Sequence, residues 1–238
     1  MLSQQTLLGR ILRSPLSLIP RDTEVRILRG PLRGKKWIVG SGPHAYWVGA
    51  YEVNHLRDFG AAITPGTVVY DVGANVGIYS LLASSRTGPS GKVFAFEPLE
   101  RNVRYLRRHM QLNGVENCVV LQTAVCNEEG TRQFSGASWD SHMGRLSTEG
   151  EILVPSITLD NCIYGEKGLP PPNVLKIDVE GAEMELLQGA NRALAEFHPK
   201  IFLEMHSGQL YSDCREFLAA KGYRMEEKYT HVKATWRL

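Results

Sequence analysis

The segment VVYDVGANVG, residues 68–77, constrains the fold of this chain more than any other stretch. Its short apolar residues predict a buried parallel strand, and the acid and two glycines that follow predict a sharp turn. Residues 93–98, VFAFEP, predict a second strand that also ends in an acid, Glu97. In Rossmann-like sheets the glycine turn approaches the ligand and the second acid accepts the ribose hydroxyls. The two segments together predict a nucleoside pocket.

The glycine spacing indicates which nucleoside cofactor this pocket binds. A dinucleotide fold favours G-x-G-x-x-G, because the backbone must admit a pyrophosphate. Here the turn carries Gly73 and Gly77, and Asp71 before it would repel a pyrophosphate but suits the amino group of an amino acid. The pattern resembles the first motif of class I S-adenosylmethionine (SAM) methyltransferases. This resemblance implies that Asp71, Gly73, Asn75 and Gly77 hold the methionine part of SAM.

The size and charge of the chain argue against several classes of protein. With 238 residues, of which 43% are hydrophobic, the chain can bury a substantial core. Its net charge of +2 implies no strong field for nucleic acid or for an anionic membrane. Four scattered cysteines without a C-x-x-C pair argue against a zinc knuckle or a disulfide scaffold and suit the cytoplasm. No apolar run approaches the roughly 20 residues of a membrane span.

Strand-like and helix-like segments alternate through most of the chain. The expected strands are residues 68–72, 92–97, 118–123, 174–178 and 200–206, with a closing antiparallel hairpin at 223–227 and 231–236. The expected helices are at about 51–62, 77–86, 99–113, 158–164, 181–195 and 212–221. The alternation predicts an α/β fold in which a mostly parallel seven-stranded sheet carries helices on both faces. Between residues 127 and 158 we expect an inserted hairpin with a loop near 138–147.

A second group of ionisable residues follows the fourth and fifth strands. Ligands of open α/β sheets bind outside the carboxyl ends of the strands, where the strand order reverses. Strand alternation places Lys176, Asp178 and Glu180 on one side of the fourth strand, and Glu204 and His206 on one face of the fifth. Burial and mutual repulsion shift the pKa values of such groups, as acid–base chemistry requires. The simpler interpretation of Glu183 is that it opposes the dipole of the following helix.

The ordered set of motifs resembles the FkbM-type methyltransferase family over about residues 25–210. The motifs are WVGAYE at 47–52, DVGANVG at 71–77, FEP at 96–98, TLD at 158–160, KIDVEGAE at 176–183 and EMH at 204–206. The resemblance implies a class I methyltransferase fold and SAM as methyl donor. It also implies an oxygen acceptor on a sugar, polyketide or other secondary metabolite, so the expected partner is a small molecule or a glycan.

With this resemblance the motif residues take expected roles. Glu97 and Pro98 are expected at the ribose, Thr123 and Ala124 at the adenine, and Trp47, Tyr51 and Glu52 at the acceptor. Asp178 or His206 would be the general base, with Glu204 orienting it and Glu180 beside them. Alternatively, Asp178 and Glu204 would hold a divalent metal such as Mg²⁺.

We expect two parts in the chain. Residues 1–60, part helix and part strand, would contribute to the acceptor site, and residues 61–238 would form the methyltransferase domain. Apolar residues among the first twenty predict a short helix that packs on the domain or on a second subunit, which leaves a homodimer open.

Three other functions remain as alternatives. An RNA methyltransferase is disfavoured by the near-neutral charge, although four arginines lie on one predicted helix, at 101, 104, 107 and 108. A nucleoside-binding protein without chemistry is disfavoured by the acids on the fourth and fifth strands. A nicotinamide dehydrogenase is disfavoured by the glycine spacing.

Overall fold

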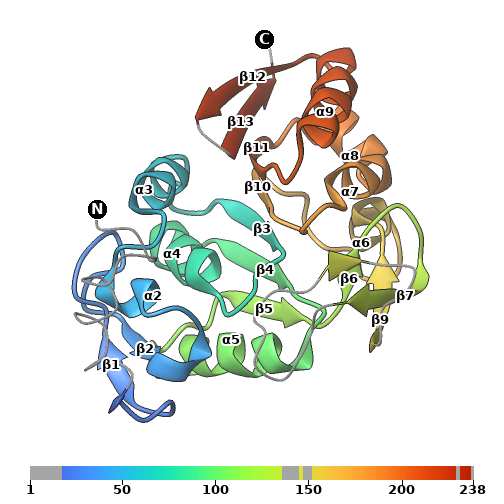
Figure 1. Cartoon of the computed structure of the whole chain (residues 1–238). Helices are drawn as coiled ribbons and strands as arrows, with labels where there is room; N and C mark the ends of the chain where they lie inside the picture. Colours follow the sequence, from blue (N-terminus) through green and yellow to red (C-terminus); the bar gives the residue numbers. More distant parts are fainter. Residues whose placement is uncertain (1–17, 136–144, 147–151, 229–230, 237–238) are drawn as a thin grey trace.

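A computed structural model describes residues 18–135, 145–146, 152–228 and 231–236 (Figure 1). The helix expected near the N-terminus and most of the loop expected at 138–147 lie outside the described residues. Within them, no helix is both long enough and apolar enough to cross a membrane.

The centre of the molecule is a seven-stranded sheet in the order β12-β13-β11-β10-β3-β4-β5. Its strands are β3 (Val68–Val72), β4 (Lys92–Phe96), β5 (Cys118–Leu121), β10 (Val174–Ile177), β11 (Lys200–Glu204), β12 (Tyr223–Lys228) and β13 (His231–Trp236). The strands β5, β4, β3, β10 and β11 pair in parallel, and β13 runs antiparallel to both its neighbours. The mostly parallel sheet with an antiparallel C-terminal hairpin is therefore confirmed. The chain order reverses between β3 and β10, which places the ligand-binding crevice at their carboxyl ends.

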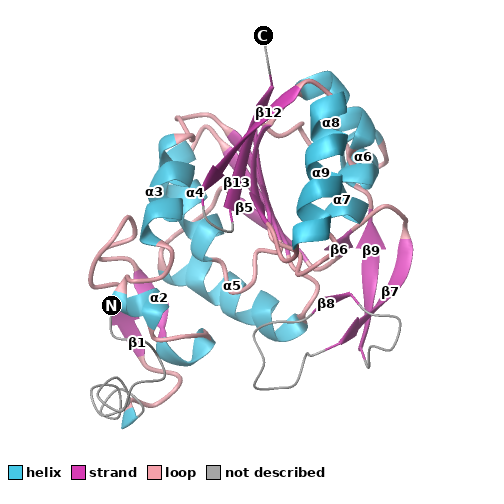
Figure 2. Cartoon of the chain, turned by 45° about the horizontal axis from the view of Figure 1, so that its top comes forward, coloured by secondary structure: helices cyan, strands magenta, loops and turns pink. Residues whose placement is uncertain are grey.

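Helices cover both faces of this sheet (Figures 1 and 2). One face carries α3 (Val53–Ala61), α4 (Ile78–Thr87) and α5 (Glu100–Leu112), and the other carries α6 (Leu159–Tyr164), α7 (Glu183–Gly189), α8 (Asn191–Phe197) and α9 (Gly208–Ala220). Strand alternation supplies the two cores: Val69 packs with the first group, while Tyr70 and Val72 pack with the second. Because β3 is covered on both sides, it reads as a nearly continuous apolar run.

Two smaller sheets flank the central one. An N-terminal hairpin of β1 (Glu24–Arg26) and β2 (Lys36–Ile38) precedes the short helix α2 (Ala45–Val48). A second sheet has the order β6-β9-β7-β8 and contains β6 (Ala124–Val125), β7 (Gly130–Ser135), β8 (Arg145–Leu146) and β9 (Ile152–Ile157). The expected third strand at 118–123 therefore ends at Leu121, and the chain crosses into this second sheet.

His109 on α5 ties the N-terminal hairpin to the glycine turn. Its ring stacks on Trp37 at 3.7 Å, its Nε2 accepts the Ile38 N–H at 3.1 Å, and its Nδ1–H donates to the Val76 carbonyl at 2.8 Å. Burial lowers the pKa of His109 to about 4, so the ring is neutral and both nitrogens keep these roles. The N-terminal segment thus packs onto the glycine turn that follows β3.

The helix expected at 181–195 is instead two helices that meet at Ala190. The Asp160 carboxylate accepts the N–H groups of Arg192 and Ala193 at 2.9 and 2.8 Å. These bonds cap the first turn of α8, so a new helix begins there.

Candidate functional site

A pocket opens at the carboxyl ends of β3, β4 and β10. Six of the residues expected to bind the cofactor line it: Gly73, Asn75, Glu97, Pro98, Thr123 and Ala124. Asp178 and Glu180, which follow β10, form another part of its wall. The structure therefore brings six of the eight residues expected at the cofactor together in one pocket.

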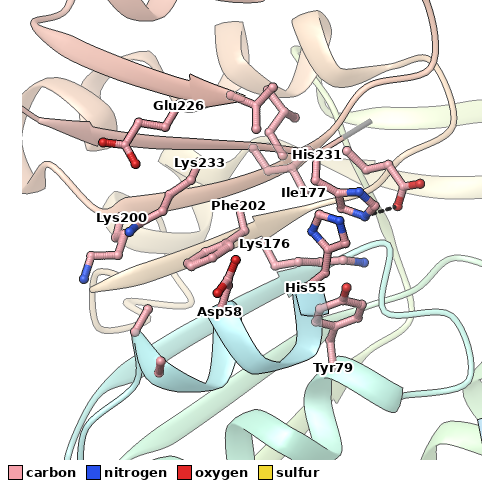
Figure 3. Close-up of a pocket in the computed structure, with 15 residues that line it drawn as sticks. His55, Asp58, Tyr79, Lys176, Ile177, Lys200, Phe202, Glu226, His231 and Lys233 are labelled. Atoms are coloured by element: carbon pink, nitrogen blue, oxygen red, sulfur yellow. Dashed lines mark ion pairs between the residues drawn. The ribbon is translucent and has the colours of Figure 1, made fainter. Parts of the chain in front are cut away.

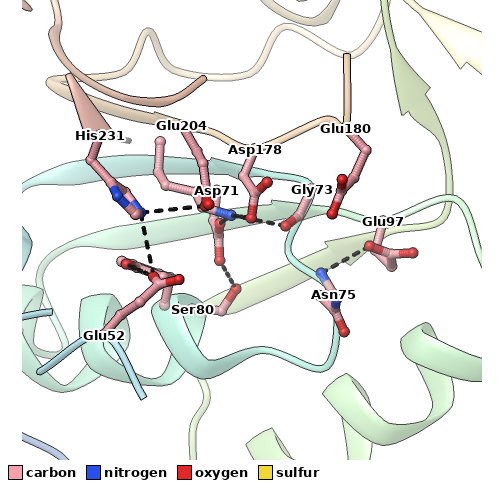
Figure 4. Close-up of polar contacts among 12 residues, drawn as sticks. Glu52, Asp71, Gly73, Asn75, Ser80, Glu97, Asp178, Glu180, Glu204 and His231 are labelled. Atoms are coloured by element: carbon pink, nitrogen blue, oxygen red, sulfur yellow. Dashed lines mark hydrogen bonds and ion pairs between the residues drawn. The ribbon is translucent and has the colours of Figure 1, made fainter. Parts of the chain in front are cut away.

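The turn after β3 is held in a left-handed conformation over the end of β4. Gly73 has a φ of 72°, and a Cβ atom there would lie 1.7 Å from the Asp178 carbonyl oxygen. Asn75 also has a positive φ, 51°, and its N–H donates to Glu97 Oε2 at 2.8 Å (Figure 4). The turn therefore links the two expected halves of the pocket through one hydrogen bond, and Gly73 permits the close approach of β3 to β10.

Glu97 is a buried carboxylate at the wall of this pocket. Besides the Asn75 N–H, it accepts the Leu99 N–H and the Asn102 side-chain amide, both at 3.1 Å. Burial raises its pKa to about 7, against the lowering effect of these hydrogen bonds. Such a carboxylate is fixed in position, and of its roughly four lone-pair sites it keeps one, on Oε2, for a further donor such as a ribose hydroxyl.

Asp71 and Gly77 are not among the residues that line this pocket, so the contact expected between them and the methionine part of SAM stays a prediction. Asp71 is fully buried, accepts the Ser80 hydroxyl at 2.5 Å and lies 3.5 Å from the Lys176 ammonium. It sits on the same face of β3 as Val69, directly opposite Lys176 in the sheet. Gly77 has a φ of 94°, and a Cβ atom there would lie 2.2 Å from Leu106. Asp71 therefore fixes the strand that enters the turn through Ser80 and Lys176, and Gly77 allows the end of the turn to pack against α5.

Asp178 lies between two cationic side chains. Lys176 Nζ is 3.3 Å from Asp178 Oδ2 and also donates to the Gly73 carbonyl at 2.9 Å. His206 Nε2 is 3.6 Å from the other oxygen, Oδ1. Burial raises the pKa of Asp178, while Lys176 and His206 oppose that effect. The carboxylate is thereby fixed at the edge of the pocket, next to the turn.

His206 is held by Glu183. Its Nδ1–H donates to Glu183 Oε1 at 2.7 Å, and its Nε2 lies 3.4 Å from Glu180. The bond to Glu183 raises the pKa of His206 to about 9, although burial opposes this, so the ring is cationic at neutral pH. Glu183 also accepts the Gly181 N–H at 3.0 Å and is fully buried. The dipole interpretation of Glu183 therefore missed its contact with His206.

Glu204 does not orient His206, contrary to expectation. It lies 3.3 Å from His231 Nε2, and the same nitrogen is 3.5 Å from Glu52 (Figure 4). Tyr79 donates to Glu52 at 2.6 Å. Burial raises the pKa of Glu52, but hydrogen bonds from His231, Tyr79 and Tyr51 outweigh it and lower the pKa to about 2. Two of the three expected acceptor residues, Glu52 and Tyr51, are therefore joined in this network.

The two acids expected to share Mg²⁺ fall in different clusters. Asp178 groups with Glu180 and His206, whereas Glu204 groups with Glu52 and His231. Trp47, the third residue expected at the acceptor, is 6% exposed and belongs to the hydrophobic core.

A second pocket, a groove, runs between α3 and the face of β11 and β13 (Figure 3). Its lining includes His55, Tyr79, Lys176, Phe202, Glu204 and His231. Lys176 and Glu204 line this groove, whereas Asp178 lines the first pocket. The carboxyl end of β10 therefore separates the groove from the first pocket.

A family model described as the methyltransferase FkbM domain matches residues 71–225, more than half of the chain. The chain belongs to the FkbM methyltransferase family. The resemblance found in the motifs is therefore confirmed.

Several curated proteins are similar to this FkbM-family chain. The hexuronic acid methyltransferase AglP of Haloferax volcanii is 30% identical over 155 residues, which cover 64% of this chain and 61% of AglP. The 31-O-demethyl-FK506 methyltransferase FkbM of Streptomyces tacrolimicus is 28% identical over 170 residues, covering 56% and 63%. A part of the AMB antimetabolite synthetase AmbE of Pseudomonas aeruginosa is 30% identical over 190 residues, covering 64% and 9%. The match spans less than two thirds of each of these relatives.

Solved structures show the same fold. The methyltransferase FkbM from Methylobacillus flagellatus KT gives a TM-score of 0.52 at 17% identity, covering 81% of this chain and 53% of that one. The precorrin-6y C5,15-methyltransferase from Geobacter metallireducens GS-15 gives 0.52 at 16% identity, covering 79% and 90%. The fold is the Rossmann-like fold of class I methyltransferases.

Three functional candidates were missed by the sequence reasoning on this FkbM-family chain. His231 lies directly opposite Glu204 in the pairing of β11 with β13, so the register of the closing hairpin contains the signal for it. Tyr79 lies in the first turn of α4, and His55 lies in the first turn of α3. Helical periodicity predicts only that such residues pack against the sheet, so it gives no sign of a functional role.

Proposed function

We propose that this protein transfers the methyl group of SAM to a hydroxyl oxygen of a sugar or secondary metabolite. The observation that carries the proposal is the buried Glu97 carboxylate, joined to the Asn75 N–H and placed in one pocket with Asp178. A carboxylate for the ribose and a second one at the end of β10 are the two groups that a bound adenosyl sulfonium would need nearby.

The donors in the pocket fit SAM. Glu97 would accept the ribose hydroxyls, and the chain at Thr123 and Ala124 would contact the adenine, as both residues line the same pocket. The left-handed turn from Gly73 to Asn75 would lie against the methionine part. SAM supplies an electrophilic methyl group when it is bound.

The chain's own residues would then orient the acceptor and take its proton. As the acceptor oxygen bonds to the methyl carbon, the carbon–sulfur bond breaks, its electron pair stays on sulfur, and the hydroxyl proton must leave. Asp178 is placed to receive that proton, because it lines the cofactor pocket beside the groove and burial raises its pKa. Lys176 and His206 would hold its carboxylate in one orientation.

The acceptor would occupy the groove between α3 and the face of β11 and β13, which we call the acceptor groove. The similarity to a hexuronic acid methyltransferase and to a 31-O-demethyl-FK506 methyltransferase supports an oxygen on a glycan or a secondary metabolite. All four cysteines are free thiols, which suits a cytoplasmic enzyme.

Labelled SAM and a panel of sugar and macrolide acceptors test this proposal. Asp178→Asn should keep near-wild-type affinity for SAM and lose about 10²–10⁴ in turnover, the usual cost of removing a general base. The matched control is Asp22→Asn, which changes an exposed aspartate and should leave turnover unchanged. Full turnover by Asp178→Asn would remove Asp178 as the base. No methyl transfer to any hydroxyl acceptor, with SAM bound, would overturn the proposed reaction.

A further inference from the structure

The acceptor groove has an ordered floor of polar and aromatic side chains. Lys200, Phe202 and Glu204 alternate along β11 and share one face of the sheet. On the neighbouring strand, His231 is opposite Glu204 and Lys233 is opposite Phe202. The floor therefore has three successive levels, with the acid–histidine pair at the carboxyl edge and the lysines farther from it.

We propose that this groove binds a sugar bearing an anionic group, a carboxylate or a phosphate, with that group held by Lys200 and Lys233. The proposal rests on the proposed function, because it assigns this ligand as the methyl acceptor. The sugar ring would lie on Phe202, and the hydroxyl to be methylated would point to the carboxyl edge.

The spacing of the levels fits one sugar ring. Side chains two residues apart on a strand are about 7 Å apart. The backbone of Lys233 thus lies about 7 Å along the sheet from that of His231 and Glu204, which leaves the length of one sugar ring over Phe202. Figure 3 shows Lys200 and Lys233 extending away from His231, and Phe202 lies between the two lysines on one side and His231 on the other.

Phe202 offers a fixed surface for the ring. Its side chain is partly buried, and Phe59 packs edge-on against it at 5.3 Å between ring centroids. An aromatic face with a few placed polar groups is the usual composition of a small-molecule site.

The two lysines have capacity for an anion. Both are half-buried, and among the described residues no carboxylate lies within ion-pair distance of either. Asp58 and Glu226 also line the groove, and Glu226 is the cross-strand partner of Lys233. The carboxylates of Asp58 and Glu226 can accept hydrogen bonds from sugar hydroxyls. A groove that contains both lysines and carboxylates therefore suits a charged sugar better than a simple organic acid.

Titration of methyl glucuronide, glucose 6-phosphate and methyl glucoside into the whole protein tests the proposal. With S-adenosylhomocysteine present, we expect at least one charged sugar to bind about tenfold more tightly than the uncharged methyl glucoside, a preference that salt weakens. The first two ligands distinguish a carboxylate from a phosphate. The double variant Lys200→Met, Lys233→Met should lose the preference, and Lys92→Met, an exposed lysine at the start of β4, should keep it.

Equal affinity for charged and uncharged sugars, or no binding of either charged sugar at millimolar concentration, overturns the proposal. Unchanged selectivity in the folded double variant also overturns it. S-adenosylhomocysteine binding, measured on the same samples, reports separately on the proposed function. Cofactor binding without selectivity would overturn the anionic-sugar site alone. Selectivity without cofactor binding would overturn the methyltransferase proposal, and with it the role of the sugar as methyl acceptor, but not the sugar site itself.

Discussion

Replacing Glu183 by glutamine tests whether this buried acid controls the charge of His206. The substitution keeps an oxygen that can accept the His206 Nδ1–H but removes the negative charge 2.7 Å from the ring. Asp178 and Glu180 remain near Nε2, at 3.6 and 3.4 Å. The change therefore isolates the contribution of Glu183 from that of the two acids on the other side of the ring.

The expected effect follows from the pKa of His206. Its rise from 6.5 to about 9 has the bond to Glu183 as its largest cause. At about 1.4 kcal/mol for each pKa unit this rise would be about 3 kcal/mol, and solvent screening of the half-exposed ring reduces the preference for its protonated form to about 1–2 kcal/mol. We expect Glu183→Gln to lower the pKa of His206 by about 1–2, because a neutral acceptor replaces a charged one.

The sign of the stability effect is set by the raised pKa. The stabilisation by protonated His206 is fully present below pH 6.5 and is lost as the pH rises through about 9. The wild type should therefore lose stability between these values, and Glu183→Gln should lose less. Titration of the His206 ring by NMR, with urea unfolding at pH 6.5 and 9.5, measures both effects.

Glu185→Gln is the matched control for this prediction. Glu185 is the other acid in the first turn of α7, so it shares the helix dipole with Glu183. An equal fall in the His206 pKa in both variants would assign the effect to the dipole. An unchanged pKa in Glu183→Gln would refute the reasoning.

Two further substitutions test the pocket's supports. Gly73→Ala should weaken S-adenosylhomocysteine binding at least about tenfold by calorimetry, because the new Cβ would lie 1.7 Å from the Asp178 carbonyl oxygen. Gly114→Ala is the control: Gly114 has a φ of 62° and open space around it, so the substitution imposes similar backbone strain without the clash. This variant should bind S-adenosylhomocysteine normally. Because the pKa of His109 is about 4 in the folded chain, the protein should lose about 2 kcal/mol of stability between pH 6.5 and 5 in urea unfolding. His109→Gln should lack this loss, and an identical pH dependence in both proteins would contradict the assignment.

The sequence predicted the sheet, and the gathering of most expected cofactor residues in one pocket, because both depend on local pattern. The sequence shows a buried strand, then a glycine turn, then a second strand that ends in Glu97. This order predicts that the two strands pair in parallel, as β3 and β4 do. The inward direction of Asp71 was also predictable, because alternation along β3 from Val69 places it toward α4 and opposite Lys176. Asp71 directly precedes the glycine turn in the sequence, but it belongs to the strand β3.

The partners of His206 and Glu204 could not be predicted in this way. The pairing of Glu183 with His206 joins the start of α7 to the residues after β11, and no local pattern reports that contact. The pairing of Glu204 with His231 depends on the register of the closing hairpin. The arginine-rich helix was likewise ambiguous: Arg101 donates to the carbonyls of Gly40 and Ser41 and so anchors the N-terminal segment.

Calorimetric titration with S-adenosylhomocysteine tests the central claim, that the Glu97 pocket is an adenosyl site, most directly. At pH 8.5, above the pKa of about 7 of Glu97, the account predicts binding at one site per chain and a loss of about 10–100-fold in affinity for Glu97→Gln, because a charged acceptor of the ribose hydroxyls is removed. Glu100→Gln, an exposed acid in the first turn of α5, should bind as the wild type does. Absence of binding by the wild type, or equal binding by Glu97→Gln, would contradict the claim.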